Sequence, residues 1–297
     1  MTRLSESTTM PDRMHLDRPA ALIDGTEVSW DGLLPMLSEI AGESALAEVV
    51  LDRAVARAFE NAGLVLTQEL VDQERSLVLG SLVASGNESV SLDELRISRG
   101  LGPVRFDRVL RRTAMLRMLV QPMVVVTDDL IKDRFDIVHG ETVTFRVMTV
   151  RDRAIVEKIW HDMAARTGTL GRLEFAAQAV IHSTDVTAQQ GGLMLRVSPS
   201  DPAYPEVIRN AIATTTPGTI SQVLALGDGQ YALVWVEETY PPDGVQFEAV
   251  RNELKRELVL RQERVHMDAM VRQLTAGVVV QPLDPSLAWS WNGVHDR

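Results

Sequence analysis

The sequence predicts an α+β protein in which helices predominate and a small module of strands and helices interrupts them. Apolar residues recur at helical spacing, with capping residues between the segments, over much of the first 140 residues. The run Thr142–Val150 is instead rich in β-branched residues, which favour strands. A long amphipathic stretch from Phe247 to Ala276 follows the module and predicts a further helix. The chain therefore passes from a helical part into a mixed module and back into a helix.

The composition is that of a globular protein with an acidic surface. The 297 residues are enough for two domains, and 45% hydrophobic residues can fill both cores. A net charge of -11 argues against nucleic acid as a partner, because phosphate binding needs an excess of lysine and arginine. There is no cysteine, and the six histidines do not have the spacing of metal ligands. Glycine-rich phosphate loops are also absent, so we expect neither a metal nor a cofactor.

The first 19 residues are polar and are predicted to form a disordered leader. They contain no apolar run typical of a secretion signal, and no later segment approaches the ~20 apolar residues of a membrane span. The sequence as given therefore predicts a cytoplasmic protein. A mis-assigned start codon that hides a signal peptide would instead place the protein in the periplasm or cell envelope.

The helical part is predicted to open with a hairpin. The dipeptide Asp24-Gly25 separates two short runs of apolar or β-branched residues, which is a hairpin signal. Ser29 is placed to cap a helix over residues 30–40. Gly42 is expected to break the chain before a longer helix over residues 45–61.

Four more helices are predicted before residue 141, from their capping residues and from glycine or proline at their ends. They cover residues 68–84, 92–99, 104–119 and 128–139. The third of these carries arginines interleaved with apolar residues. We interpret it as an amphipathic helix with a solvated basic face rather than as an anion site. The arginines are Arg105, Arg108, Arg111, Arg112 and Arg117.

The interrupting module is predicted to have the element order β-α-α-α-β-β. In order, the elements cover residues 142–150, 151–165, 173–180, 204–213, 219–224 and 231–237. The helix after the module has an apolar face that needs a partner. Val278–Val280 could then add a strand, and Trp289 and Trp291 belong to a short tail in which both are expected to be packed.

The module resembles the parvulin-type (PpiC or rotamase) peptidyl-prolyl isomerases. The residues that carry the resemblance are Phe175, Ala179, Ser183, Asp185, Gly191, Gly192, Ala211, Gly218, Ile220 and Ser221. The order of elements in the whole chain resembles SurA-like chaperones, in which a C-terminal helix returns to pack on the N-terminal helical domain. The resemblance implies a helical domain over residues 20–140, a parvulin-like domain over 141–241, a helix within 242–282 and a tail over 283–297.

The resemblance also implies a site that binds proline. The family provides two histidines, a Cys or Asp between them, and an apolar proline slot. Here the two histidine positions hold Val147 and Tyr231, and Asp185 falls on the Cys or Asp position. The slot positions hold Met194, Tyr204 and Ile208. The predicted catalytic residues are thus Asp185 and Tyr231, and the predicted substrate-binding residues are Val147, Met194, Tyr204 and Ile208.

Each of these residues also has a purely structural interpretation. Asp185 in a Ser-Thr-Asp loop is typical of a turn, and Tyr231 at a strand start is typical of a half-buried structural tyrosine. Met194, Tyr204 and Ile208 are equally suited to a core.

The function that the resemblance implies is a folding chaperone that binds extended or proline-containing segments of client chains. Its isomerase activity is expected to be reduced or lost, because both histidines of the family are replaced. Two alternatives stay open. In the first, an active isomerase relies on the apolar slot, with assistance from Asp185 and Tyr231. In the second, the fold is a non-catalytic scaffold or interaction protein.

Overall fold

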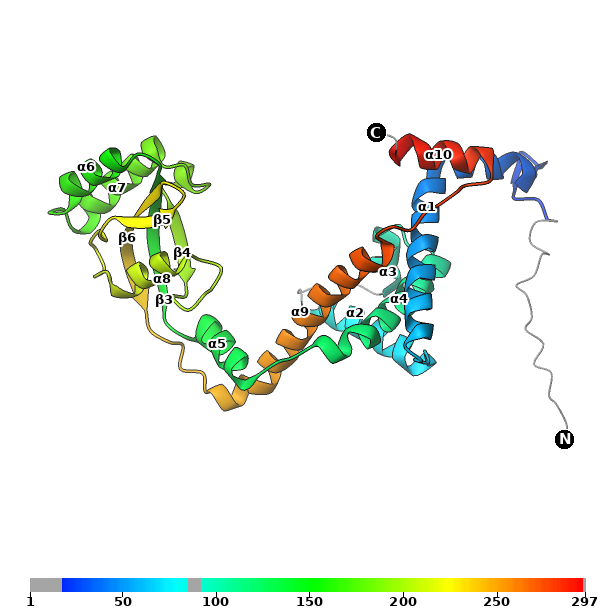
Figure 1. The fold of residues 1–297 in the computed structure, drawn as a ribbon, viewed down its shortest axis with the longest axis horizontal. Coiled ribbons are helices and arrows are strands. Elements are labelled where there is room, and N and C mark those ends of the chain that lie inside the picture. Colours follow the sequence, from blue (N-terminus) through cyan, green and yellow to red (C-terminus); the bar gives the residue numbers. More distant parts are fainter. Residues whose placement is uncertain (1–17, 85–91, 296–297) are drawn as a thin grey trace. The chain divides into compact units, whose positions relative to one another are not determined.

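The chain folds as an α+β protein in a computed structural model that describes residues 18–84 and 92–295 (Figure 1). The predicted fold class is confirmed. Contacts divide the chain into two compact units: one holds the residues up to Val124 and from Glu263 onward, and the other holds residues 125–262. The second unit is thus inserted into the first. The predicted leader, residues 1–19, lies almost entirely outside the described residues.

The first unit opens with the predicted hairpin of β1 (Ala21–Ile23) and β2 (Thr26–Val28), which pair antiparallel. Its turn residues Asp24 and Gly25 both have positive φ, at 50° and 81°. A two-residue turn of this kind matches the twist of the flanking strands. The hairpin leads into Ser29, whose side chain caps the next helix as predicted, accepting a hydrogen bond from Gly32 N–H at 3.4 Å.

The helix α1 (Trp30–Asn61) runs without a break, so the predicted interruption at Gly42 is wrong. Gly42 is buried where the C-terminal helix α10 (Pro285–His295) crosses α1. A Cβ atom on Gly42 would lie 2.7 Å from Leu287 of α10, and the Ser290 hydroxyl accepts a hydrogen bond from Glu43 N–H at 2.9 Å. The glycine therefore permits close helix packing rather than ending the helix.

Three further helices complete the N-terminal part of this unit: α2 (Gln68–Ala84), α3 (Leu92–Ser98) and α4 (Pro103–Val120). A short turn, η2 (Gln121–Met123), follows α4. The fully buried side chains lie on α1, α2 and α4, as the helical spacing of apolar residues predicts. They include Val55, Val71, Leu110 and Val120.

The C-terminal part of the chain is more helical than predicted. The long helix α9 (Phe247–Thr275) agrees with the sequence, but the tail forms α10 instead of an irregular segment. Trp289 on α10 is 68% exposed, so the expectation that it is packed is wrong, whereas Trp291 is partly buried. Val278–Val280 is not a strand. None of the described helices is both long and apolar enough to cross a membrane.

The second unit begins with α5 (Asp128–His139), which packs against the start of α9. Arg134 pairs with Glu257 at 2.6 Å, and the rings of Phe135 and Phe247 meet edge to face. These contacts join α5 and the start of α9 to the second unit, which therefore spans residues 125–262. The parvulin-like domain inferred from the resemblance is shorter, at residues 141–241. Those domain limits stay predictions.

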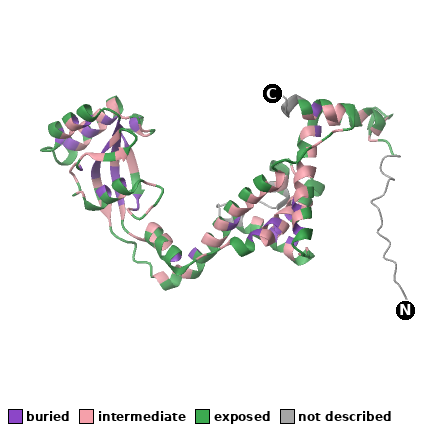
Figure 2. Ribbon diagram, in the orientation of Figure 1, coloured by how far each residue is buried: buried purple, intermediate pink, exposed green. Residues whose placement is uncertain are grey.

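The centre of the second unit is an antiparallel sheet with strand order β4-β3-β6-β5. The long central strands are β3 (Thr142–Val150) and β6 (Gln230–Tyr240), and the edges are β4 (Leu193–Val197) and β5 (Leu224–Gly227). Buried residues concentrate along the two central strands (Figure 2).

Helices cover both faces of this sheet. The helices α6 (Arg153–Met163) and α7 (Gly168–His182) pack on one face, and α8 (Glu206–Thr214) packs on the other. The short turn η3 (Ala188–Gln190) precedes the double glycine. The strand β4 was not predicted, because its five residues follow directly on the glycine loop and do not alternate clearly between apolar and polar.

Candidate functional site

The predicted substrate-binding residues gather on the sheet face that α8 covers. Val147 of β3 lies opposite Val234 of β6 and is 9% exposed, and Ile208 of α8 packs in the same cluster and is 5% exposed. Met194 of β4 and Tyr204, just before α8, are partly buried against that cluster. The structure therefore brings all four residues together. Because Val147 and Ile208 are nearly inaccessible, only Met194 and Tyr204 have surface left to offer a ligand.

Asp185 lies in the loop after α7 and stabilises that loop. Its carboxylate accepts hydrogen bonds from the backbone N–H of Thr187 at 2.8 Å and from the Thr187 hydroxyl at 2.5 Å. The loop is fastened to β3, because Thr149 N–H donates to the Ser183 hydroxyl at 3.1 Å. Both contacts of Asp185 are typical of a turn-forming aspartate.

Tyr231 lies on the opposite face of the sheet from the slot residues. It pairs with Val150 across β3 and β6, whereas Val147 pairs with Val234. Successive residues of a strand point to opposite faces, so Tyr231 and Val147 cannot face the same ligand. Tyr231 instead packs against the cluster that α6 and α7 cover. The register thus places Tyr231 away from the slot residues, and the catalytic roles of Tyr231 and Asp185 stay predictions.

The α8-facing surface of the sheet carries no histidine. Val147 and the β6 residues Ala232 and Val234 occupy its centre. His161 stacks against Trp160 on α6, and His182 ends α7, on the other face. Within the described ranges, no three histidine or acidic side chains come together as metal ligands do. No imidazole of the described chain therefore lies at the centre of this face.

Electrostatics on this face centre on Tyr204. Burial raises the pKa of its phenol above the ordinary value, and the nearby Asp201 adds to the rise. Tyr204 is thus a neutral hydroxyl beside an apolar cluster at physiological pH.

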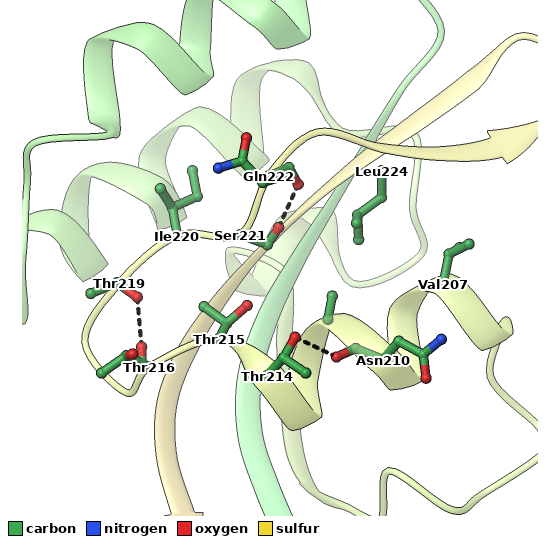
Figure 3. Close-up of a pocket in the computed structure, with 11 residues that line it drawn as sticks. Val207, Asn210, Thr214, Thr215, Thr216, Thr219, Ile220, Ser221, Gln222 and Leu224 are labelled. Atoms are coloured by element: carbon green, nitrogen blue, oxygen red, sulfur yellow. Dashed lines mark hydrogen bonds between the residues drawn. The ribbon is translucent and has the colours of Figure 1, made fainter.

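An open hollow of about 510 Å³ adjoins this cluster, between α8 and the segment that leads from it into β5 (Figure 3). Two of its lining residues, Ala211 and Leu224, also belong to or pack against the cluster that contains Val147. No charged side chain lines it. The lining residues are Val207, Asn210, Ala211, Thr214, Thr215, Thr216, Thr219, Ile220, Ser221, Gln222 and Leu224.

The wall of the hollow opposite α8 is held against β6 by backbone hydrogen bonds. Ser221 N–H donates to the carbonyl of Val234 at 2.8 Å, and Val236 N–H donates to the carbonyl of Thr219 at 3.2 Å. The Ser221 hydroxyl also accepts from Val234 N–H at 3.0 Å. The hollow is therefore built on the central strand of the sheet rather than on a loose loop.

Several polar groups in the hollow are available to a ligand. The side chains of Asn210, Thr215, Thr216 and Gln222 have no hydrogen-bond partner in the part of the chain that the structure describes. By contrast, the Thr219 hydroxyl donates to the backbone carbonyl of Thr216 at 2.6 Å (Figure 3). Uncharged donors and acceptors beside apolar surface suit the backbone of an extended peptide.

The sequence analysis did not identify the polar lining of this hollow. Thr214, Thr215 and Thr216 precede Pro217-Gly218, and such a run is typical of a helix end followed by a turn. The signal that could have found it is the group of three adjacent hydroxyls at the end of the helix that carries Ile208.

Fold and site together define an α+β protein in which a module with a four-stranded antiparallel sheet is inserted into a helical unit. No family model matches the chain, and neither does any curated protein.

Solved structures similar to the chain share little sequence with it. One is a peptidylprolyl isomerase, PrsA, from Bacillus cereus, at 15% identity over 94% of this chain and 98% of that one, with a TM-score of 0.41. The foldase protein PrsA from Streptococcus pneumoniae is 13% identical over 91% and 97%, with a TM-score of 0.42. A match described in connection with the SurA-like chaperones PEB4 and Cj1289 of Campylobacter jejuni is 15% identical over 89% and 99%, with a TM-score of 0.35.

Proposed function

We propose that this protein is a SurA-like folding chaperone whose parvulin-like module binds extended or proline-containing segments of client chains. Its peptidyl-prolyl isomerase activity is reduced or lost. The observation that carries the proposal is the uncharged hollow beside α8, which combines apolar surface with unpaired amide and hydroxyl groups. Both the cytoplasm and the cell envelope stay predictions for its location.

The hollow suits a peptide better than a small charged ligand. An extended peptide has a backbone donor and acceptor at each residue and needs partners for both. Asn210 and Gln222 side chains supply donors and acceptors, and Thr215 and Thr216 hydroxyls supply both as well. Val207 and Leu224 offer apolar contact for a proline ring or another small side chain.

Loss of isomerase activity follows from the aliphatic centre of the sheet face. Rotation about an X-Pro bond crosses a barrier of roughly 20 kcal/mol, which a protein lowers by hydrogen bonds and fixed dipoles around the twisted imide. Val147, Ala232 and Val234 offer no side-chain donor at this position. Binding alone stabilises the ground state and the twisted state equally, and so leaves the rate unchanged.

We expect Asn210→Arg to weaken the chaperone effect without unfolding the module. Asn210 is exposed on α8, so the longer side chain can fill the hollow without burying its charge. Suppression of aggregation of a denatured client by the full chain is the measurement. The variant should lose at least about half of the suppression, since it blocks the proposed contact surface.

The matched control is Ala213→Arg, which adds the same side chain to an exposed position of α8 outside the hollow. It should behave like the unmodified protein. Equal losses in both variants would mean that the hollow is not the binding surface.

A non-catalytic scaffold is the second candidate, and an apolar stripe on α7 favours it. Leu170, Leu173 and Ile181 lie on one side of this helix and are all exposed. A scaffold would give one stoichiometric partner in a pull-down and no suppression of client aggregation. A chaperone should give the reverse.

A further inference from the structure

A second open groove, also of about 510 Å³, lies wholly within the helical unit, between α1 and the segment after α9. Its floor is the apolar stripe of α1 that includes Leu46, Val50 and Ala54, and Leu274 closes one end. The opposite wall is the valine segment, defined here as Val278, Val279 and Val280. This groove shares no residue with the hollow beside α8.

The valine segment lies outside every helix and strand of the described chain, and most of its backbone groups are unpaired. Val278 N–H donates to Thr275 at 3.2 Å, but the backbone groups of Val279 and Val280 have no hydrogen-bond partner within the described ranges. Val279 is 92% exposed. Three consecutive β-branched residues favour the extended conformation, and free backbone groups beside a groove are a template for pairing with another strand.

The groove also carries two arginines without an acidic partner. Arg53 and Arg57 lie one turn apart on α1 and line the groove. Two arginines of α4 instead pair with α1, since Arg112 contacts Asp52 at 2.6 Å and Arg105 contacts Glu48. No carboxylate in the described chain pairs with Arg53 or Arg57.

We propose that this groove binds an extended client segment that pairs with the valine segment as an added strand and places a carboxylate beside Arg53 and Arg57. The groove thus selects apolar segments that carry an acidic residue. The inference rests on the proposed chaperone function and adds a second, charge-selective client site to it. A strand partner satisfies the free backbone groups, which an aliphatic ligand such as a fatty acid cannot do.

The charge preference is local, because the chain as a whole has a net charge of -11 and repels acidic partners at long range. Two guanidinium groups at the groove attract a carboxylate at short range, where their fork-shaped donors fit it. Binding of an acidic segment is therefore expected to weaken as salt rises.

The test uses the full chain and two short labelled peptides that alternate valine and threonine and differ only in a central glutamate or lysine. Fluorescence anisotropy should show the glutamate peptide binding about tenfold more tightly than the lysine peptide. Arg53→Gln combined with Arg57→Gln should remove this preference. Both side chains are exposed, so neither substitution threatens the fold. The control Arg264→Gln, an exposed arginine outside the groove, should keep it.

Val279→Pro tests the strand pairing independently of charge. Proline removes a backbone donor at an exposed position that has no native hydrogen bond, so the fold is retained. Both peptides should then bind at least about fivefold more weakly.

Three results would overturn the inference. The first is equal affinity for the glutamate and lysine peptides, and the second is a preference for the glutamate peptide that survives the double arginine substitution. The third is displacement of the glutamate peptide by laurate together with unchanged peptide affinity in Val279→Pro. If neither peptide binds the full chain while Asn210→Arg still weakens suppression of aggregation, the inference falls and the proposed function stands. If the unmodified full chain does not suppress aggregation of a denatured client at all, the chaperone function itself is wrong.

Discussion

Replacing Gly192 with alanine should lower the free energy of unfolding of the module by about 4 kcal/mol, because positive φ and a backbone clash act together. Gly192 has a φ of 75°, which disfavours any side chain. A Cβ atom there would lie 2.1 Å from the carbonyl oxygen of Val147. Moving Gly192 away from β3 to relieve the clash would break the hydrogen bond that Val147 N–H donates to the Gly192 carbonyl at 2.8 Å.

Gly229→Ala is the matched control for this prediction. Gly229 also has positive φ, at 69°, but nothing lies within 4 Å of its missing Cβ. It should cost only about 1 kcal/mol, the conformational part of the effect. Hydrogen exchange of the β3 and β6 amides in increasing urea, measured on the full chain, reports the free energy of unfolding of the module in each variant. Equal losses of protection would show that contact with β3 is unimportant.

Arg117→Met should destabilise the helical unit by about 3–5 kcal/mol, because it leaves two buried carboxylates without their cation. The guanidinium of Arg117 on α4 contacts Glu74 of α2 and Glu263 of α9, which are 3% and 8% exposed. Burial opposes the charged form of Arg117, but hydrogen bonds to Glu74 and the charges of both carboxylates raise its pKa.

Arg111→Met is the control for this ion network, since Arg111 lies on the same helix in an exposed pair with Asp107. An exposed pair of this kind contributes about 0.5 kcal/mol or less. Urea unfolding followed by exchange of α2 and α4 amides compares the two. If Arg117→Met shifts the unfolding midpoint no more than Arg111→Met, the buried network does not attach α9 to this unit.

Much of the fold could be predicted from local signals. The hairpin at Asp24-Gly25, the cap Ser29 and the strand β3 all appear in the structure. Each depends on backbone preferences or on hydrogen bonds between residues close together in the chain, so a local pattern is enough to predict it.

The differences depend on contacts between distant residues. Gly42 is helical because Leu287 and Ser290 pack on it, and no local pattern reveals that contact. The tail forms α10 for the same reason, as one partner of that packing. Tertiary packing overrides the local tendency of glycine to end a helix.

The candidate site shows the same limit. Val147 and Ile208 fall in one buried cluster, and their role in binding proline stays a prediction. The sheet face toward which Tyr231 points depends on the register between β3 and β6, and a shift of one residue would move its side chain to the other face. The hollow depends on how the segment after α8 pairs with β6, which the sequence does not state.

The most direct test of the central claim is two-dimensional exchange NMR of a short X-Pro peptide with the full chain. We expect the peptide resonances to shift on binding while cis–trans exchange stays as slow as in free peptide, at tens of seconds or longer. The shifts should disappear in Asn210→Arg and persist in Ala213→Arg. Exchange accelerated manyfold by a small fraction of protein would contradict the account, because the apolar face around Val147 would then be catalytic after all.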